Sequence, residues 1–205
     1  MWFFNRNCTN YLFYEKDPGV AVPDVRDTNY KAKTKAANPE FHWIDWNIDD
    51  FFSGKGDVMK SITDANDPDL TPFLLDENRK MIIYHGLTDT LIVASDTIDY
   101  YDDLVDVTFN GDLKTAQRSA RLFLAPGMNH CGGGDGPNTW DKLSPLVNWV
   151  ENGVTPESII ATHTTNGEID NERPLCAYPK QAKYIGSASD ASSPQSWRAE
   201  NFQCQ

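Results

Sequence analysis

The segment ARLFLAPGMNHCGGGDGP, residues 120–137, joins a strand pattern to a glycine-rich loop. Its short apolar run ends at a Pro-Gly turn, which predicts a buried strand over residues 120–127. His130 and Cys131 then stand side by side ahead of three consecutive glycines. Glycine loses more conformational freedom on folding than any other residue. Such a run therefore indicates that the backbone at this point must adopt a conformation or a close contact that larger residues do not allow.

The sequence on both sides of this segment alternates between strand and helix patterns. Residues 80–85 form another short apolar run, closed by Gly86, and residues 95–107 place apolar side chains on one face of a predicted helix. Residues 158–163 are a last strand candidate. This alternation predicts the α/β fold class, with a parallel sheet flanked by helices.

A second helix is predicted between Trp140 and Gly153. Pro145 would damage a helix that ran through it, so we expect a shorter helix with Ser144 as N-cap, Pro145 as first residue and Gly153 as the stop. The apolar positions at helical spacing are Trp140, Leu143, Val147 and Val150.

Length and composition exclude several classes of protein. The chain has 205 residues, of which 40% are hydrophobic, and a formal net charge of −12, so it is long enough for a core and lacks the basic surface that nucleic acid requires. Without a run of 18 apolar residues, no membrane span is expected. Residues 1–75 are aromatic and acidic and predict a packed lobe or the edge of a cap, whereas the α/β pattern occupies residues 76–205.

The first residues lack the basic and apolar regions of a signal peptide. Either the protein is not exported, or the 205 residues are not the whole precursor.

Four cysteines are present, and none has the C-x-x-C spacing of a metal or redox site. A bridge between Cys176 and Cys204 would close a tail rich in glycine, serine and proline, although two unrelated buried thiols would have the same spacing. The bridge is favoured, and it favours an oxidising compartment. The remaining cysteines are Cys8 and Cys131.

Two loops that follow predicted strands offer groups for catalysis. The first contains His85 and Asp89, and the second contains His130. Ligands of open α/β sheets bind beyond the carboxyl ends of the strands, and an Asp followed by a His is the second half of the Ser, Asp, His order of α/β-hydrolases. A satisfied structural histidine and an aspartate that caps a helix would look the same in the sequence. A metal site formed by His85, Asp89, His130 and Cys131 has no familiar ligand spacing.

Several motifs occur in one order: HGLTDTLI, DTIDYYDDLV, FLAPGMNHCGGGDGPNTWD, LVNWVENGVTPESIIAT, RPLCAYP and NFQC. Together they resemble the C-terminal part of the tannase and feruloyl esterase family of secreted α/β-hydrolases, from about Asp67 to Cys204. The resemblance implies that residues 1–75 end a lid, that Asp89 is the acid and His130 the base of a Ser-His-Asp triad, and that Cys131 pairs with a cysteine beside the nucleophilic serine. It also implies the bridge from Cys176 to Cys204 and a location outside the cell.

The nucleophile of the family has no counterpart in these residues. No G-x-S-x-G pattern occurs, and only Ser53 and Ser61 precede Asp89, neither of them in an elbow sequence. The calcium loop of the family lid is not recognisable, so no cofactor or metal is expected in this chain. Three explanations are therefore open: the chain is a fragment of a longer gene, one chain of a cleaved enzyme, or a truncation that has lost catalysis.

Two functions remain open. The first is a serine carboxylic-ester hydrolase that acts on small hydroxyaromatic esters, such as gallates or ferulates, with the serine on the N-terminal half of the same enzyme. The alternative is an inactive truncated hydrolase that acts as a binding or structural remnant.

Overall fold

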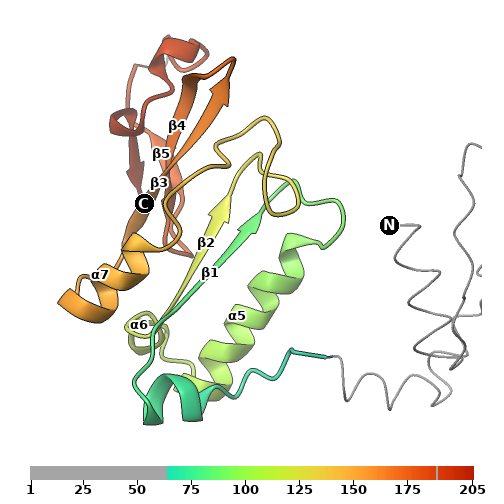
Figure 1. Cartoon of the computed structure of the whole chain (residues 1–205), viewed down its shortest axis with the longest axis vertical. Coiled ribbons are helices and arrows are strands. Elements are labelled where there is room, and N and C mark those ends of the chain that lie inside the picture. The colour runs from blue at the N-terminus through green and yellow to red at the C-terminus, as the bar shows by residue number, and fades with distance from the viewer. Residues whose placement is uncertain (1–63, 188) are drawn as a thin grey trace, which may run out of the picture. The chain divides into compact units, whose positions relative to one another are not determined.

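The computed structural model, drawn in Figure 1, describes residues 64–187 and 189–205. The chain divides into two units, Met1–Asn66 and Asp67–Gln205, so almost all of the described structure belongs to the second unit. Most of the segment predicted to end a lid lies outside the described residues, and so do Cys8, Ser53 and Ser61.

Two parallel strands form the centre of the described unit (Figure 1). Strand β1 (Met81–Gly86) pairs with β2 (Ala120–Ala125) along their whole length, so both strands end at the same edge. Helix α5 (Ala94–Phe109) and the short helix α6 (Leu113–Ala116) connect them. The expected strand, helix and strand are all present, which gives this region its α/β character.

The two faces of the parallel pair are covered by different elements. On one face Tyr101 and Leu104 of α5 are fully buried against Leu122, and the Tyr101 hydroxyl donates to the Ala120 carbonyl at 3.0 Å. On the other face Phe123 belongs to a second buried cluster. Successive residues of a strand point to opposite faces, so β2 contributes to both clusters.

The last expected strand is present, but it does not extend the parallel pair. Strand β3 (Ser158–Thr165) pairs antiparallel with β4 (Glu168–Cys176). The turn between them is Asn166-Gly167, with φ of 53° and 86°. Two consecutive positive φ values belong to the tight turn that matches the twist of a hairpin. An antiparallel bridge from Ala177 to Phe123 connects the end of this hairpin to β2.

Helix α7 (Ser144–Asn152) differs from the prediction in its start and in its buried face. Ser144 is the first helical residue rather than the N-cap, and the Asp141 carboxylate accepts its N–H at 2.9 Å. Trp140 lies before the helix and packs, partly buried, against the cluster that contains Phe123, whereas within the helix Trp149 is the buried residue. Gly153 ends the helix with φ 71°, as predicted. The exposed apolar positions are Leu143, Val147 and Val150.

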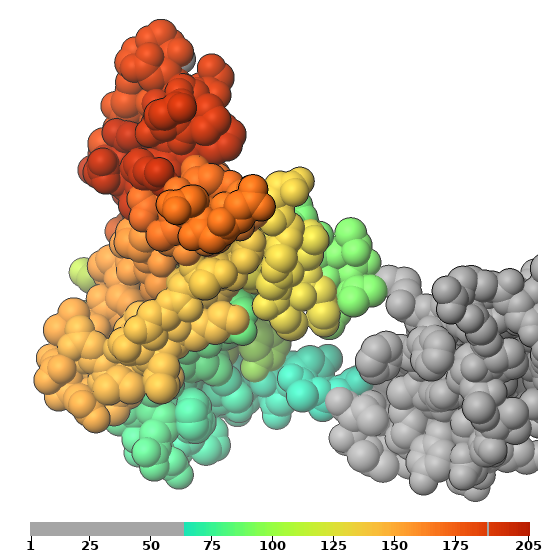
Figure 2. Space-filling model, turned by 45° about the horizontal axis from the view of Figure 1, so that its top comes forward, coloured from blue at the N-terminus to red at the C-terminus, as the bar shows by residue number. Residues whose placement is uncertain are grey.

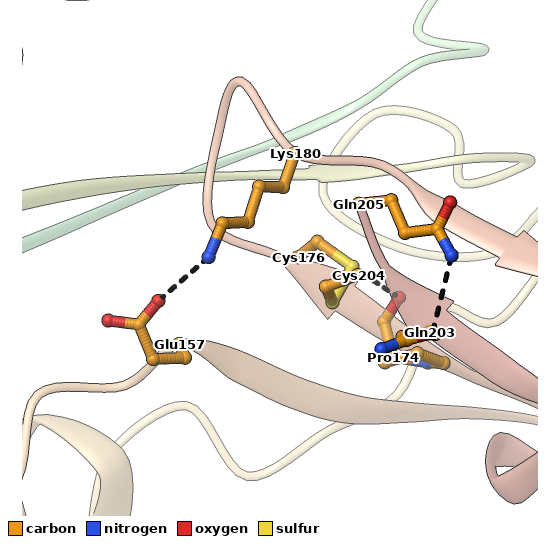
Figure 3. Close-up of a disulfide and its surroundings, with 7 residues drawn as sticks. All are labelled: Glu157, Pro174, Cys176, Lys180, Gln203, Cys204 and Gln205. Carbon is orange, nitrogen blue, oxygen red and sulfur yellow. Dashed lines mark hydrogen bonds and ion pairs between the residues drawn. A yellow bond between two sulfur atoms is a disulfide. The ribbon is translucent and has the colours of Figure 1, made fainter.

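The tail folds back onto the hairpin and is fixed there by a disulfide. Strand β5 (Ala182–Tyr184) pairs antiparallel with β6 (Phe202–Cys204). The predicted bridge joins Cys176, at the end of β4, to Cys204, over a sequence separation of 28 residues (Figure 3). Residues 64–187 and 189–205 also contain a π-helical turn at Thr71–Asp76 and 3-10 turns at Pro194–Ser196 and Ala199–Asn201.

No helix in the described part of the chain is both long and apolar enough to cross a membrane.

Candidate active site

The loops that follow β1 and β2 lie side by side and are joined by hydrogen bonds. Figure 2 shows the yellow residues after β2 at the surface, beside the green loop after β1. The Leu87 N–H donates to the Ala125 carbonyl at 3.0 Å, and the Thr88 N–H donates to the Met128 carbonyl at 3.1 Å. The Thr88 hydroxyl donates to the same carbonyl at 2.7 Å. The relative position of the two loops is therefore set mainly by the backbone.

Gly86, the last residue of β1, is required by this close approach. A Cβ atom at this position would lie 2.3 Å from the Met128 carbonyl oxygen. Real Cβ atoms do not come that close to backbone, so a larger residue would push the loops apart.

Asp89 and His130 meet where the two loops join. Nδ1 of His130 lies 2.8 Å from Oδ2 of Asp89. The Asp89 side chain is only 5% exposed, and its other oxygen, Oδ1, accepts the N–H groups of Leu91 and Ile92 at 2.8 and 3.1 Å. The structure thus brings together the two residues that the sequence suggested as acid and base.

The hydrogen bonds of Asp89 keep it ionised. Burial by itself would raise the pKa of this carboxyl, but the hydrogen bonds from His130, Ile92 and Leu91 outweigh it and lower the pKa to about 2. An ionised carboxylate only accepts hydrogen bonds, so Nδ1 of His130 carries the proton. In the neutral ring Nε2 is then the basic nitrogen.

His130 leaves this nitrogen without a partner in the described unit. Its side chain is 42% exposed, and among residues 64–187 and 189–205 no group forms a hydrogen bond with Nε2. An oriented imidazole with a free Nε2 can take a proton from a hydroxyl group and return it to a leaving alcohol.

The glycine-rich loop after His130 has two different kinds of glycine. Gly134 has φ 94°, and a Cβ atom there would lie 2.1 Å from the Gly127 carbonyl oxygen, whereas a Cβ atom on Gly132 would meet nothing within 4 Å. The Gly136 N–H donates to the Gly127 carbonyl at 3.0 Å. The loop therefore folds back against the backbone of Gly127, which explains why glycine is needed at position 134.

Cys131 is exposed and has a positive φ of 60°, which is unusual for a residue other than glycine. It forms no disulfide within the described part of the chain.

His85 also belongs to this site; the sequence named it beside Asp89 in the first loop and in a possible metal cluster, but gave it no role in the triad. Its Nε2 lies 3.5 Å from Oδ2 of Asp89. Within the described ranges, no group of three or more His, Cys, Asp or Glu side chains has the arrangement of a metal site. The role of Thr88 in joining the loops had no signal in the sequence, because it depends on a carbonyl 40 residues away.

Comparisons with known proteins place the chain among ester hydrolases by similarity. A family model described as tannase and feruloyl esterase matches residues 5–199. Mono(2-hydroxyethyl) terephthalate hydrolase of Piscinibacter sakaiensis is 46% identical over 126 residues, which are 60% of this chain and 20% of that protein. A probable feruloyl esterase of Arthroderma benhamiae is 35% identical over 152 residues, which are 72% of this chain and 26% of that protein.

The solved structure of an esterase from Aspergillus oryzae has the same fold. It superposes with a TM-score of 0.67 and 26% identity, over 82% of this chain and 35% of that one. The chain spans about a fifth to a quarter of the length of the two curated relatives above.

Proposed function

The chain belongs to the tannase and feruloyl esterase family, and on that premise we propose that it supplies the acid and the base of a serine carboxylic-ester hydrolase. His130 is the general base and Asp89 the residue that orients it. The observation that carries the proposal is the 2.8 Å hydrogen bond between Nδ1 of His130 and the buried, ionised carboxylate of Asp89.

The reaction needs each of these features. As the serine oxygen attacks the ester carbonyl, Nε2 of His130 takes the hydroxyl proton, and Asp89 stabilises the imidazolium that forms. His130 then gives the proton to the departing alcohol, which leaves an acyl-enzyme. A water molecule, deprotonated by the same nitrogen, releases the acid and restores the serine.

The serine of this proposal comes from sequence outside the 205 residues, on the N-terminal half of the same enzyme. Neither Ser53 nor Ser61 has the surroundings of a nucleophile in the sequence. The partly exposed His130 side chain, whose Nε2 has no hydrogen-bond partner among the described residues, supports a partner group there. In this proposal Cys131, which is exposed and next to the base, forms a disulfide with a cysteine beside the serine.

The proposed substrates are small esters of aromatic acids. Gallate and ferulate esters are suggested by the family, and a terephthalate monoester by the name of the bacterial relative. These acyl groups share an aromatic ring attached, directly or through a short linker, to the reacting carbonyl. The reaction needs no cofactor, because serine, histidine and aspartate supply all of its groups.

We also propose that the protein works outside the cell. The Cys176–Cys204 bridge supports this, because structural disulfides persist mainly in oxidising compartments.

The experiment that tests the function is active-site labelling of the natural protein. The purified, non-reduced protein is treated with a fluorophosphonate, its intact mass is measured, and hydrolysis of methyl gallate, methyl ferulate and mono(2-hydroxyethyl) terephthalate is assayed. We expect one label on a serine outside the sequence printed here, and loss of ester hydrolysis on labelling. An unlabelled protein that hydrolyses none of the three esters would overturn the proposal.

A further inference from the structure

His85 lies beneath the candidate site and is held at both ring nitrogens. It is the residue before Gly86 in β1, and its side chain is only 11% exposed. Nδ1 lies 2.7 Å from the Thr97 hydroxyl in the first turn of α5, and Nε2 lies 3.1 Å from the Ile92 carbonyl in the loop after β1. One ring thus joins the strand, the loop and the helix.

These partners fix the tautomer of the neutral His85 ring. A carbonyl oxygen only accepts hydrogen bonds, so Nε2 carries the proton and donates to Ile92. Nδ1 is then the acceptor, and the Thr97 hydroxyl donates to it. The Nε2–H that faces Ile92 also lies 3.5 Å from Oδ2 of Asp89, the oxygen that holds His130.

From this geometry we propose that His85 is a positioning residue for Asp89, an inference that rests on the proposed function. The Asp89 carboxylate has two oxygens, and the loop amides hold only Oδ1. The direction of Oδ2, and with it the orientation of His130, depends on the path of the loop from Gly86 to Val93. His85 fixes that path by binding the Ile92 carbonyl, and its N–H adds a favourable dipole beside Oδ2.

His85 does not act as a second base. Both of its nitrogens are engaged, and the ring is buried, whereas Nε2 of His130 has no hydrogen-bond partner among the described residues. Its contribution passes through Asp89 rather than through contact with a substrate.

The test uses variants of both partners in the contact. His85→Phe keeps the bulk of the ring but removes both nitrogens, and His85→Gln restores an amide N–H near the position of Nε2. Thr97→Val removes the hydroxyl that donates to Nδ1 of His85, and Thr97→Ser restores it. His163→Phe is the control, because His163 belongs to the β3–β4 hairpin.

The first readout is the Nδ1–H proton of His130 by NMR, which is shifted downfield and protected from exchange while Asp89 holds it. We expect His85→Phe to lose this signal, and His85→Gln, Thr97→Ser and His163→Phe to keep it. This measurement needs no turnover, so it separates failure of the positioning role from failure of the proposed hydrolase function.

The second readout is the kinetics of ester hydrolysis. We expect His85→Phe to lower kcat about 10- to 100-fold with KM nearly unchanged, because a misdirected base affects the chemical step. Thr97→Val should lower kcat about threefold to tenfold, the loss expected from one hydrogen bond.

An unchanged His130 signal and kcat in folded His85→Phe would overturn the inference. If His85→Phe does not fold, the comparison of Thr97→Val with Thr97→Ser tests the inference instead. Equal kcat and equal proton signals in Thr97→Val and Thr97→Ser would then contradict the positioning role.

Discussion

The described unit contains two histidine–aspartate pairs of nearly equal length, in two different regions. His130 and Asp89 are 2.8 Å apart in the site region, which consists of β1, β2 and the loops after them. His163 and Asp170 are 2.7 Å apart in the hairpin region, which consists of β3, β4 and the tail. Distance alone does not distinguish a candidate catalytic pair from a structural one.

The surroundings of the two aspartates make the difference. Asp89 is 5% exposed, is held by backbone N–H groups and binds a histidine 41 residues away. Asp170 is 41% exposed, accepts the Thr165 hydroxyl and binds a histidine seven residues away, across the register shift of its own hairpin. The first pair joins two loops at the end of a sheet, whereas the second stabilises one local turn.

The largest expected difference between the pairs is in catalysis. Asp89→Asn should lower kcat of the ester hydrolysis by about 10³- to 10⁴-fold, because the amide no longer holds the required tautomer of His130 or stabilises its charge. Asp170→Asn is the matched control and should leave kcat within about threefold, as expected for a surface change away from the site. Steady-state kinetics on the same ester measures both. Equal losses in the two variants would remove the distinction between the pairs.

Removal of the disulfide should destabilise the hairpin region and spare the site. For a loop of 28 residues, replacing Cys176 and Cys204 with alanine should lower the free energy of unfolding by about 3–4 kcal/mol in the chain-entropy model. Urea unfolding measures this loss. We expect the Nδ1–H signal of His130 to persist under native conditions, and its loss would show that the two regions are coupled.

The glycine-rich loop offers a matched pair of substitutions inside the site region. Gly134→Ala should destabilise the fold by about 2–4 kcal/mol, because the methyl group would overlap the Gly127 carbonyl at a positive φ. Gly132→Ala should change stability by less than about 0.5 kcal/mol, since open space surrounds that position. Thermal unfolding compares the two variants, and a similar loss for both would contradict the backbone contact at Gly127.

The smallest expected effect is the dependence of stability on pH. The pKa of Asp89 is about 2 in the folded protein and has an ordinary value of 3.8. The unfolded state therefore takes up the proton first, so the contribution of Asp89 is complete above about pH 4 and is lost as the pH falls towards 2. Asp89→Asn should reduce the fall in unfolding free energy between pH 5 and pH 2. An identical fall in Asp89→Asn and in the natural sequence would contradict the low pKa.

Much of the site region could be predicted from the sequence, because its signals are local. The apolar runs that became β1 and β2, each followed by a glycine turn, were sufficient to place Asp89 and His130 at one edge of a sheet. The contacts that join the loops could not be predicted. They run from Thr88 to the carbonyl of Met128, and a carbonyl has no sequence signal.

The hairpin region was predicted less well, although it contains a strong signal. Asn166-Gly167, directly after the Thr-rich end of β3, is typical of a two-residue hairpin turn, and it would have shown that β3 pairs with the strand after it. The start of helix α7 was predicted to within one residue, because Pro145 marks the first turn of the helix. Asp141 accepts the N–H groups of Leu143 and Ser144, so Ser144 is the first helical residue rather than the N-cap.

The bridge at the end of β4 has a consequence for proteolysis. The tail from Ile185 to Arg198 lies between the two cysteines, and its described residues are mostly exposed, so it is a natural target for a protease. A cut there would release nothing, because Cys204 holds the severed piece to Cys176. The next residue, Ala177, bridges to Phe123 of the central pair. A nicked molecule would therefore migrate as one band on a non-reducing gel and as two after reduction, while its site remained intact.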